Sequence, residues 1–205
     1  MIRLLFVGDG DRDAVTNPHL VATLIGAPVE PEAVPWPHLH GAGKGYDRKL
    51  LFAISAARQK GLNGVVATID KDRSPGRDRL RDLTAARTRD RDTAPSLPTA
   101  LGCADPHAEA WLLDDPVAVR TVLGLVKNAM IPNVRKVASP KNELTGLHTA
   151  SPRSGDPSKT VLAEIAQALE PKRCRHAKET GYAHFSGEVR DEIGPLIAPS
   201  VAPCI

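Results

Sequence analysis

The chain has 205 residues, of which 41% are hydrophobic and 25% charged, a composition typical of a folded globular protein and not of a disordered or fibrous one. Its formal net charge of +3 permits a phosphate-rich partner but does not by itself indicate one. The three cysteines show no CxxC spacing, which argues against a disulfide scaffold and favours a reducing compartment. The N-terminal apolar run is too short for a signal peptide, and no run is long enough to span a membrane. We therefore expect a soluble cytoplasmic protein.

Predicted strands and helices alternate along the chain. Short apolar runs predict strands at 2–7, 64–69 and 96–103, and the proline-rich segment 29–39 is expected to be a loop or a poor edge strand. Helical periodicity and start and stop signals predict helices at 11–24, 49–60, 76–89, 106–113, 116–126, 159–169 and 187–197. The segment 127–156, rich in Pro, Ser, Gly and Asn, is expected to form loops.

Alternation of this kind predicts an α/β fold, with a Rossmann-like, mainly parallel sheet flanked by helices. We expect residues 1–126 to form this α/β domain. Residues 127–205 are expected to form a loop and helical C-terminal extension packed on it. Ligands of such sheets bind at the carboxyl ends of the strands, and two acidic motifs follow two of the predicted strands.

The first acidic motif is Asp9-Gly10-Asp11-Arg12-Asp13. Asp9 closes the first predicted strand, and Asp13 lies in the first turn of the following helix. Asp11 is predicted to be the N-cap of that helix, because a short side-chain acceptor there binds the free N–H groups of the first turn.

The second motif is Asp70-Lys71-Asp72, at the end of the second well-defined strand. Residues two apart in an extended segment point to the same side, so both carboxylates are expected to face one site. Either motif alone is common at surface turns, and it is their joint placement at two strand ends that favours a functional site. Mg²⁺ or Mn²⁺ suits such a sparse carboxylate site, with Asp9, Asp13, Asp70 and Asp72 as the candidate metal ligands.

Glu109 and several basic residues are further candidates. Glu109 lies next to an apolar Trp-Leu-Leu run, where a carboxylate needs a partner, although a Glu is also favoured at a helix N-terminus. Neighbouring His107 is a candidate acid or base. The alternative, and the commoner role of a histidine, is an ordinary hydrogen-bonded side chain. Lys44, Arg73 and Arg77 are candidate phosphate contacts.

The motifs together resemble the Toprim domain, and the whole chain is similar to a family of small stand-alone Toprim-like bacterial proteins related to the OLD-family nucleases. The resemblance lies in the acid-Gly turn with a second acid four residues on, in the later Asp-x-Asp pair, and in looser second-half motifs. These are His107–Leu113, Pro140-Lys141 and Tyr182–Ser186. Asp9 stands where the family usually has Glu, a side chain one methylene longer.

The resemblance implies a Mg²⁺- or Mn²⁺-dependent phosphodiester hydrolase acting on DNA or RNA, with phage defence as one expected role. In it Asp9, Asp70 and Asp72 would hold metal, and Asp13 would bind metal or orient water. One alternative is a catalytically silent Toprim-like module that works with a partner protein. Another is a receiver-like phosphotransfer domain. Such a domain needs a Lys at the end of a later strand, and this sequence shows no matching Lys. The oligomeric state stays open.

Overall fold

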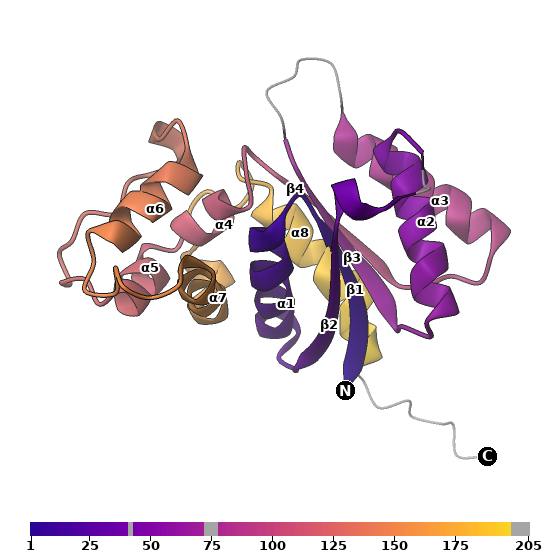
Figure 1. Ribbon diagram of the computed structural model, residues 1–205, viewed down its shortest axis with the longest axis horizontal. Coiled ribbons are helices and arrows are strands. Elements are labelled where there is room, and N and C mark those ends of the chain that lie inside the picture. The colour runs from indigo at the N-terminus through magenta and orange to yellow at the C-terminus, as the bar shows by residue number, and fades with distance from the viewer. Residues whose placement is uncertain (41–42, 72–77, 198–205) are drawn as a thin grey trace.

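The computed structural model describes residues 1–40, 43–71 and 78–197. It is an α/β fold built on a four-stranded, all-parallel sheet with helices on both faces (Figure 1). The predicted fold class is therefore confirmed. The strands lie in the order β2-β1-β3-β4, with bounds β1 Ile2–Gly8, β2 Val29–Pro35, β3 Gly64–Asp70 and β4 Thr99–Ala104.

Eight α-helices accompany the sheet in the described part of the chain. Their bounds are α1 Asp11–Ile25, α2 Tyr46–Gln59, α3 Arg79–Thr93, α4 Glu109–Leu113, α5 Pro116–Leu123, α6 Pro140–Thr149, α7 Ser158–Ala168 and α8 Tyr182–Glu188. A π-helical turn, Val189–Ile193, continues α8. No helix of the described residues is long and apolar enough to cross a bilayer.

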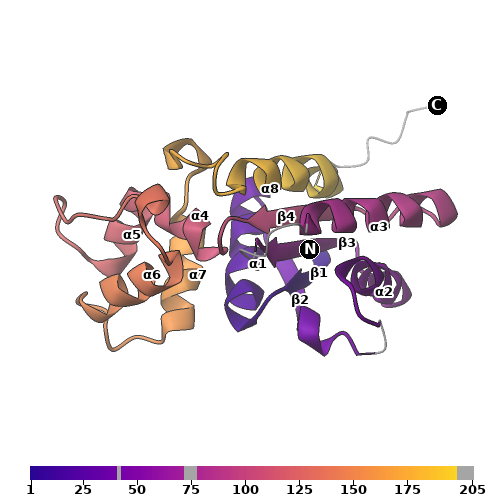
Figure 2. The ribbon, with the colours of Figure 1, turned by 90° about the horizontal axis from the view of Figure 1, so that it is seen from above.

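Side-chain alternation along the strands divides the core between the two faces of the sheet. Leu4 and Phe6 of β1 point to the face covered by α1 and α8, while Leu5 and Val7 point to the face covered by α2 and α3. Figure 2 shows α1 and α2 on opposite sides of the strands. Burial on both faces explains why β1 and β3 read as continuous apolar runs.

The helices α4 to α7 form a group beside α1, on the side away from α2 and α3 (Figure 1). Helix α7 packs along α1 and α5, and the apolar core beneath α1 continues into this group through Leu123, Leu144 and Val161. One apolar core therefore contains residues from both sides of position 126. The division into 1–126 and 127–205 stays a prediction.

Three sequence predictions about elements need correction. The segment 127–156 was expected to be loop but contains α6, where Ser139 caps the helix and Pro140 occupies its first turn, a recognised start signal. The last helix begins at Tyr182 and not at residue 187. Asp11 is not the N-cap of α1: Gly10 holds that position and Asp13 accepts its N–H.

The proline-rich segment forms a true edge strand, β2, as one of the two alternatives predicted. Its prolines Pro31 and Pro35 fit an edge position, because proline has no N–H to give to a neighbouring strand. The opposite edge, on β4, is covered instead by side chains: the carboxylate of Glu188 accepts the N–H of Leu101 at 3.1 Å, and that of Glu192 accepts the N–H of Thr99 at 3.3 Å.

Candidate functional site

The carboxyl ends of β1 and β3 lie next to each other and bring Asp9 of the first acidic motif to Asp70 of the second, as the sequence predicts. Asp9 follows β1 directly, and Asp70 is the last residue of β3. The two residues are in direct contact, because the N–H of Asp70 donates to Oδ2 of Asp9 at 2.6 Å. This contact joins the two strand ends at the top of the sheet in Figure 1.

Asp13 reaches the same place from the first turn of α1. Its Oδ2 accepts the N–H of Asp9 at 2.7 Å and that of Gly10 at 3.2 Å. The side chain therefore closes the turn between strand and helix. It supplies an acceptor for free N–H groups at the helix start. It is only 9% exposed.

Gly8 makes this close turn possible. A Cβ built on Gly8 would lie 2.5 Å from the Cβ of Asp13, which is closer than real side chains approach. Gly10, two residues on, has open space at the same position. Gly8 is thus required for the approach of α1 to the end of β1, and Gly10 is not.

Asp70 is held by the segment before α4. Its Oδ1 accepts the N–H of Ala108 at 3.1 Å, and its Oδ2 lies 3.1 Å from Nδ1 of His107. Both oxygens of Asp70 therefore have protein partners. The histidine that the sequence singled out touches the acidic cluster directly, through Asp70.

Glu109 is buried at 8% exposure and pairs with Arg12, whose Nη1 lies 2.9 Å from Oε1 of the glutamate. A buried carboxylate needs such a partner, so the sequence argument for Glu109 is met by an arginine within the first motif. The pair joins α1 to α4 beside the cluster. Arg12 was not predicted as a site residue, although it lies between Asp11 and Asp13 in the first acidic motif.

The carboxylates act on each other electrostatically. Burial, followed by the negative charge of Asp70, raises the pKa of Asp13 to about 7. Burial, followed by the charge of Asp9, raises the pKa of Asp70 to about 6, against the lowering effect of His107. Glu109 adds to both increases. Burial is the larger cause in both residues, and the neighbouring charges within the cluster formed by Asp9, Asp13, Asp70 and Glu109 add to it.

The predicted phosphate contacts are only partly placed. Arg73 and Arg77 lie outside the described residues, as does the predicted metal ligand Asp72. Lys44 is exposed in the segment before α2, and within the described residues no hydrogen bond or ion pair brings it to the cluster.

Two other cations lie close to Asp70. Arg79, the first residue of α3, donates from Nη1 to the backbone oxygen of Asp70 at 3.0 Å and stacks over the ring of Tyr46. Lys71 pairs with Asp105 at 2.7 Å. Arg79 was not predicted as a site residue. The one signal for it in the sequence is its place at the start of a helix, after the loop that follows a strand.

A pocket of about 290 Å³ opens beside the cluster, at the carboxyl end of β4. Asp105 and Pro106 line it, directly before the histidine that contacts Asp70. Its other walls combine apolar and charged groups from two segments of the second half: Val134, Arg135, Val137, Ala138, Glu179 and Thr180. The carboxylates of the cluster do not line the pocket, and its link to them is the chain adjacency of Pro106 to His107.

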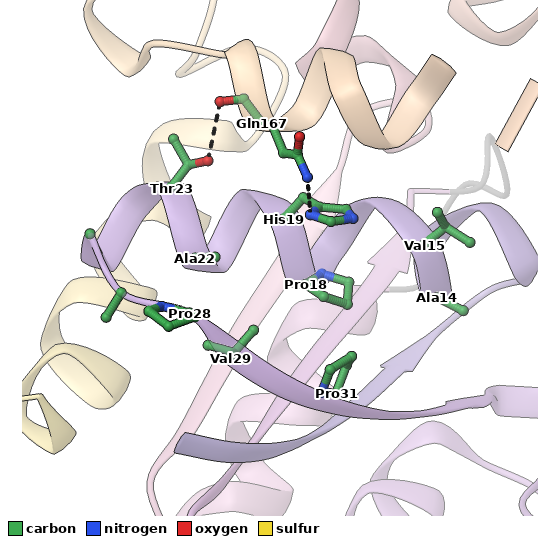
Figure 3. Close-up of a pocket in the computed structure, with 12 residues that line it drawn as sticks. Ala14, Val15, Pro18, His19, Ala22, Thr23, Pro28, Val29, Pro31 and Gln167 are labelled. Carbon is green, nitrogen blue, oxygen red and sulfur yellow. Dashed lines mark hydrogen bonds between the residues drawn. The ribbon is translucent and has the colours of Figure 1, made fainter. Parts of the chain in front are cut away.

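A second hollow is unrelated to the acidic cluster. It is an open groove of about 650 Å³ between α1, β2 and α7, lined mainly by apolar side chains such as Pro18, Val29 and Pro31 (Figure 3). Gln167 closes one side through hydrogen bonds with His19 and Thr23. None of the predicted site residues lines this groove.

The carboxylates of the cluster are the donors available to a divalent cation. Among the described residues, no three His, Cys, Asp or Glu side chains form a ready-made metal-binding group. Mg²⁺, however, is commonly held by one or two carboxylates together with water and substrate phosphates. Carboxylate oxygens are hard donors that suit a cation of that kind, and the predicted ligand Asp72 lies in the part not described.

Comparisons of the chain with protein-family models, with curated proteins and with solved structures found no match.

Proposed function

We propose that the protein is a divalent-metal-dependent phosphodiester hydrolase that acts on DNA or RNA. The observation that carries the proposal is the cluster at the ends of β1 and β3, where the N–H of Asp70 binds the carboxylate of Asp9 and the pKa of Asp13 is raised to about 7. Carboxylates that oppose one another's ionisation favour a bound cation.

Asp9, Asp13 and Asp70 would hold Mg²⁺ or Mn²⁺, with Asp72 as a predicted fourth ligand. The ion would supply charge stabilisation to a phosphodiester and lower the pKa of a bound water. Among the described residues, Asp70 holds His107 by a hydrogen bond, which suits the histidine to exchange a proton with an attacking or leaving oxygen. Arg12 compensates Glu109 and keeps that further charge out of the reaction.

Three basic groups around the cluster support a polyanionic substrate. Arg79 donates to the backbone oxygen of Asp70, and Lys71 follows Asp70 in the chain and pairs with Asp105. Lys159 pairs with the exposed Asp11 at the start of α1. Phosphates compete well for exposed Lys71 and Lys159, because surface ion pairs are weak, whereas Arg79 is half-buried. The pocket beside His107 would take part of the substrate next to the cleaved bond.

A second function is favoured by one specific observation. Both oxygens of Asp70 already bind protein groups, and Oδ2 of Asp13 binds two N–H groups. A network satisfied in this way is also what a catalytically silent module would need for stability. The short Asp9, where the resembled family has Glu, points in the same direction, and such a module would work with a partner protein.

The deciding experiment incubates the purified protein with plasmid, single-stranded DNA and RNA in Mg²⁺, Mn²⁺ or EDTA. The variants are Asp70→Asn and Asp13→Asn, and the matched control is Asp82→Asn, which changes an exposed acid in the first turn of α3. We expect metal-dependent cleavage that both cluster variants lose and the control keeps. Absence of cleavage by folded wild-type protein in either metal would reject the hydrolase and leave the silent module, which predicts no binding of Mn²⁺ by calorimetry.

A further inference from the structure

A buried polar contact lies directly beneath the acidic cluster. Nδ2 of Asn17, on α1, donates to Oγ1 of Thr68, on β3, at 2.8 Å. The two residues are 1% and 2% exposed. Oγ1 of Thr68 in turn lies 3.5 Å from the backbone oxygen of Val7, on β1. A chain of polar groups therefore crosses the core between three elements.

The same three elements carry the carboxylates. Asn17 is one helical turn after Asp13, so the two side chains lie on one face of α1. Thr68 comes two residues before Asp70, which places both on one face of β3. The third element, β1, leads directly into Asp9. The polar contact thus connects the supports of all three acids, one layer below them.

This contact is not what packing alone would favour. Oδ1 of Asn17 is buried, and no protein group among the described residues hydrogen-bonds to it. A buried acceptor without a donor costs stability, and an apolar side chain of similar size would avoid that cost. Polar groups that reduce stability in an otherwise apolar core are commonly found where function requires them.

We propose that Asn17 is a positioning residue that anchors α1 to β3 through Thr68 and so fixes the separation of Asp13 from Asp70. The role rests on the function proposed above, because it prepares the same cluster. Neither residue needs to touch a substrate. Asn17 acts through the position of the first turn of α1, and Thr68 acts through the end of β3.

The first test separates stability from activity. Asn17→Leu removes the hydrogen bond together with the unpaired acceptor, so we expect a melting temperature equal to or above that of the wild type. Cleavage should nevertheless fall about tenfold or more in kcat, with little change in KM, because displacement of a catalytic group by about 1 Å has effects of that order. Thr68→Val should lose activity similarly, and Thr68→Ser, which keeps the hydroxyl, should restore it.

Thr99→Val is the matched control. Thr99 is also a fully buried threonine of the sheet, but its hydroxyl donates to the backbone oxygen of Leu97, at the amino end of β4. We expect this variant to keep the wild-type kcat. Loss of activity in Asn17→Leu only in proportion to a lower folded fraction would overturn the proposal, since that is the result of a merely structural role.

A second readout needs no activity. The N–H groups of Asp9, Gly10 and Asp70 all donate to carboxylates of the cluster. Amide hydrogen exchange followed by NMR should become faster at these three groups in Asn17→Leu and stay unchanged in Thr99→Val. Unchanged exchange in Asn17→Leu would reject the positioning role. If the wild type cleaves nothing, the hydrolase fails, while the exchange rates still decide whether Asn17 positions the cluster.

Discussion

Oδ2 of Asp9 accepts the backbone N–H of Asp70 at 2.6 Å, which ties the end of β1 to the end of β3 across 61 residues of sequence. Through this bond the acidic cluster is part of the sheet and not of a loop laid upon it. Changes in the strand ends, in the first turn of α1 or in the charge of the cluster should therefore affect stability and ligand binding together.

The first prediction concerns the approach of α1 to β1. Gly8→Ala would place a Cβ at 2.5 Å from the Cβ of Asp13, so the helix start must move and the bonds from Asp9 and Gly10 to Asp13 must lengthen. We expect a loss of about 1–3 kcal/mol in the free energy of unfolding, as for other strained core insertions, together with loss of Mn²⁺ binding measured by calorimetry.

Gly10→Ala is the matched control for that change. Gly10 has extended backbone angles and open space at its Cβ position, so alanine should be accepted with little effect on urea unfolding or on Mn²⁺ binding. Equal effects of the two substitutions would show that the close approach at Gly8 is unimportant.

The second prediction concerns pH. The pKa of Asp13 is raised from 3.8 to about 7 in the folded protein, so between about pH 4 and pH 7 the folded state binds more protons than the unfolded state. Stability from this group is therefore complete below pH 4 and is lost as the pH rises through 7. Asp13→Asn keeps an oxygen for the N–H groups of Asp9 and Gly10 but cannot ionise. We expect it to be more stable than the wild type by about 1–3 kcal/mol at pH 8, given roughly 1.4 kcal/mol for each unit of pKa difference.

Urea unfolding at pH 4.5 and pH 8 checks this result, with the difference between variant and wild type expected to shrink strongly at the lower pH. Addition of Mg²⁺ at pH 8 should stabilise the wild type and leave Asp13→Asn nearly unchanged, because the ion would bind the buried ionised carboxylate that the variant lacks. A gain from Asp13→Asn that is the same at both pH values would contradict the assigned cause.

The third prediction concerns the pair of Arg12 and Glu109. Arg12→Met leaves a carboxylate with 8% exposure without its cation. We expect a loss of about 2–4 kcal/mol in the free energy of unfolding, since removing one partner of a buried pair leaves an uncompensated charge. The double variant Arg12→Met/Glu109→Gln should recover at least half of that loss.

A double-mutant cycle by urea unfolding measures the coupling between the two side chains. Additive effects of the single changes would show that Glu109 has another partner and that the pair does not hold α1 to α4.

The fourth prediction concerns the edge of the sheet at β4. The carboxylate of Glu188 accepts the N–H of Leu101 and is paired with Arg87. Glu188→Ala should expose that strand edge, lower the free energy of unfolding by about 1–3 kcal/mol and increase self-association, because an open edge pairs with other chains. Sedimentation velocity would detect the association, and Glu188→Gln, which keeps an acceptor, should stay closer to wild type.

The sequence by itself determined the sheet and the joining of the acids. The apolar runs before Asp9 and Asp70 are long enough for buried strands and too short for helices, and parallel strands necessarily end at one edge. That reasoning predicted that Asp9 and Asp70 lie close together. Glu109 was a candidate for another reason, its place beside an apolar run, and His107 was named only as its neighbour. Helix α6 was not predicted, because Ser139 and Pro140 start a helix within a segment whose overall composition suggests loops.

Only the tertiary structure decided what each side chain binds. Asp13 and not Asp11 closes the turn after β1, because Gly8 lets α1 approach the strand end. Arg12 pairs with Glu109 across 97 residues of sequence, and Asn17 hydrogen-bonds to Thr68 across 51. Local patterns reflect the hydrogen bonds and apolar contacts that a segment makes with its near neighbours. Pairing across the core depends on where whole elements pack, which the periodicity of one segment does not specify.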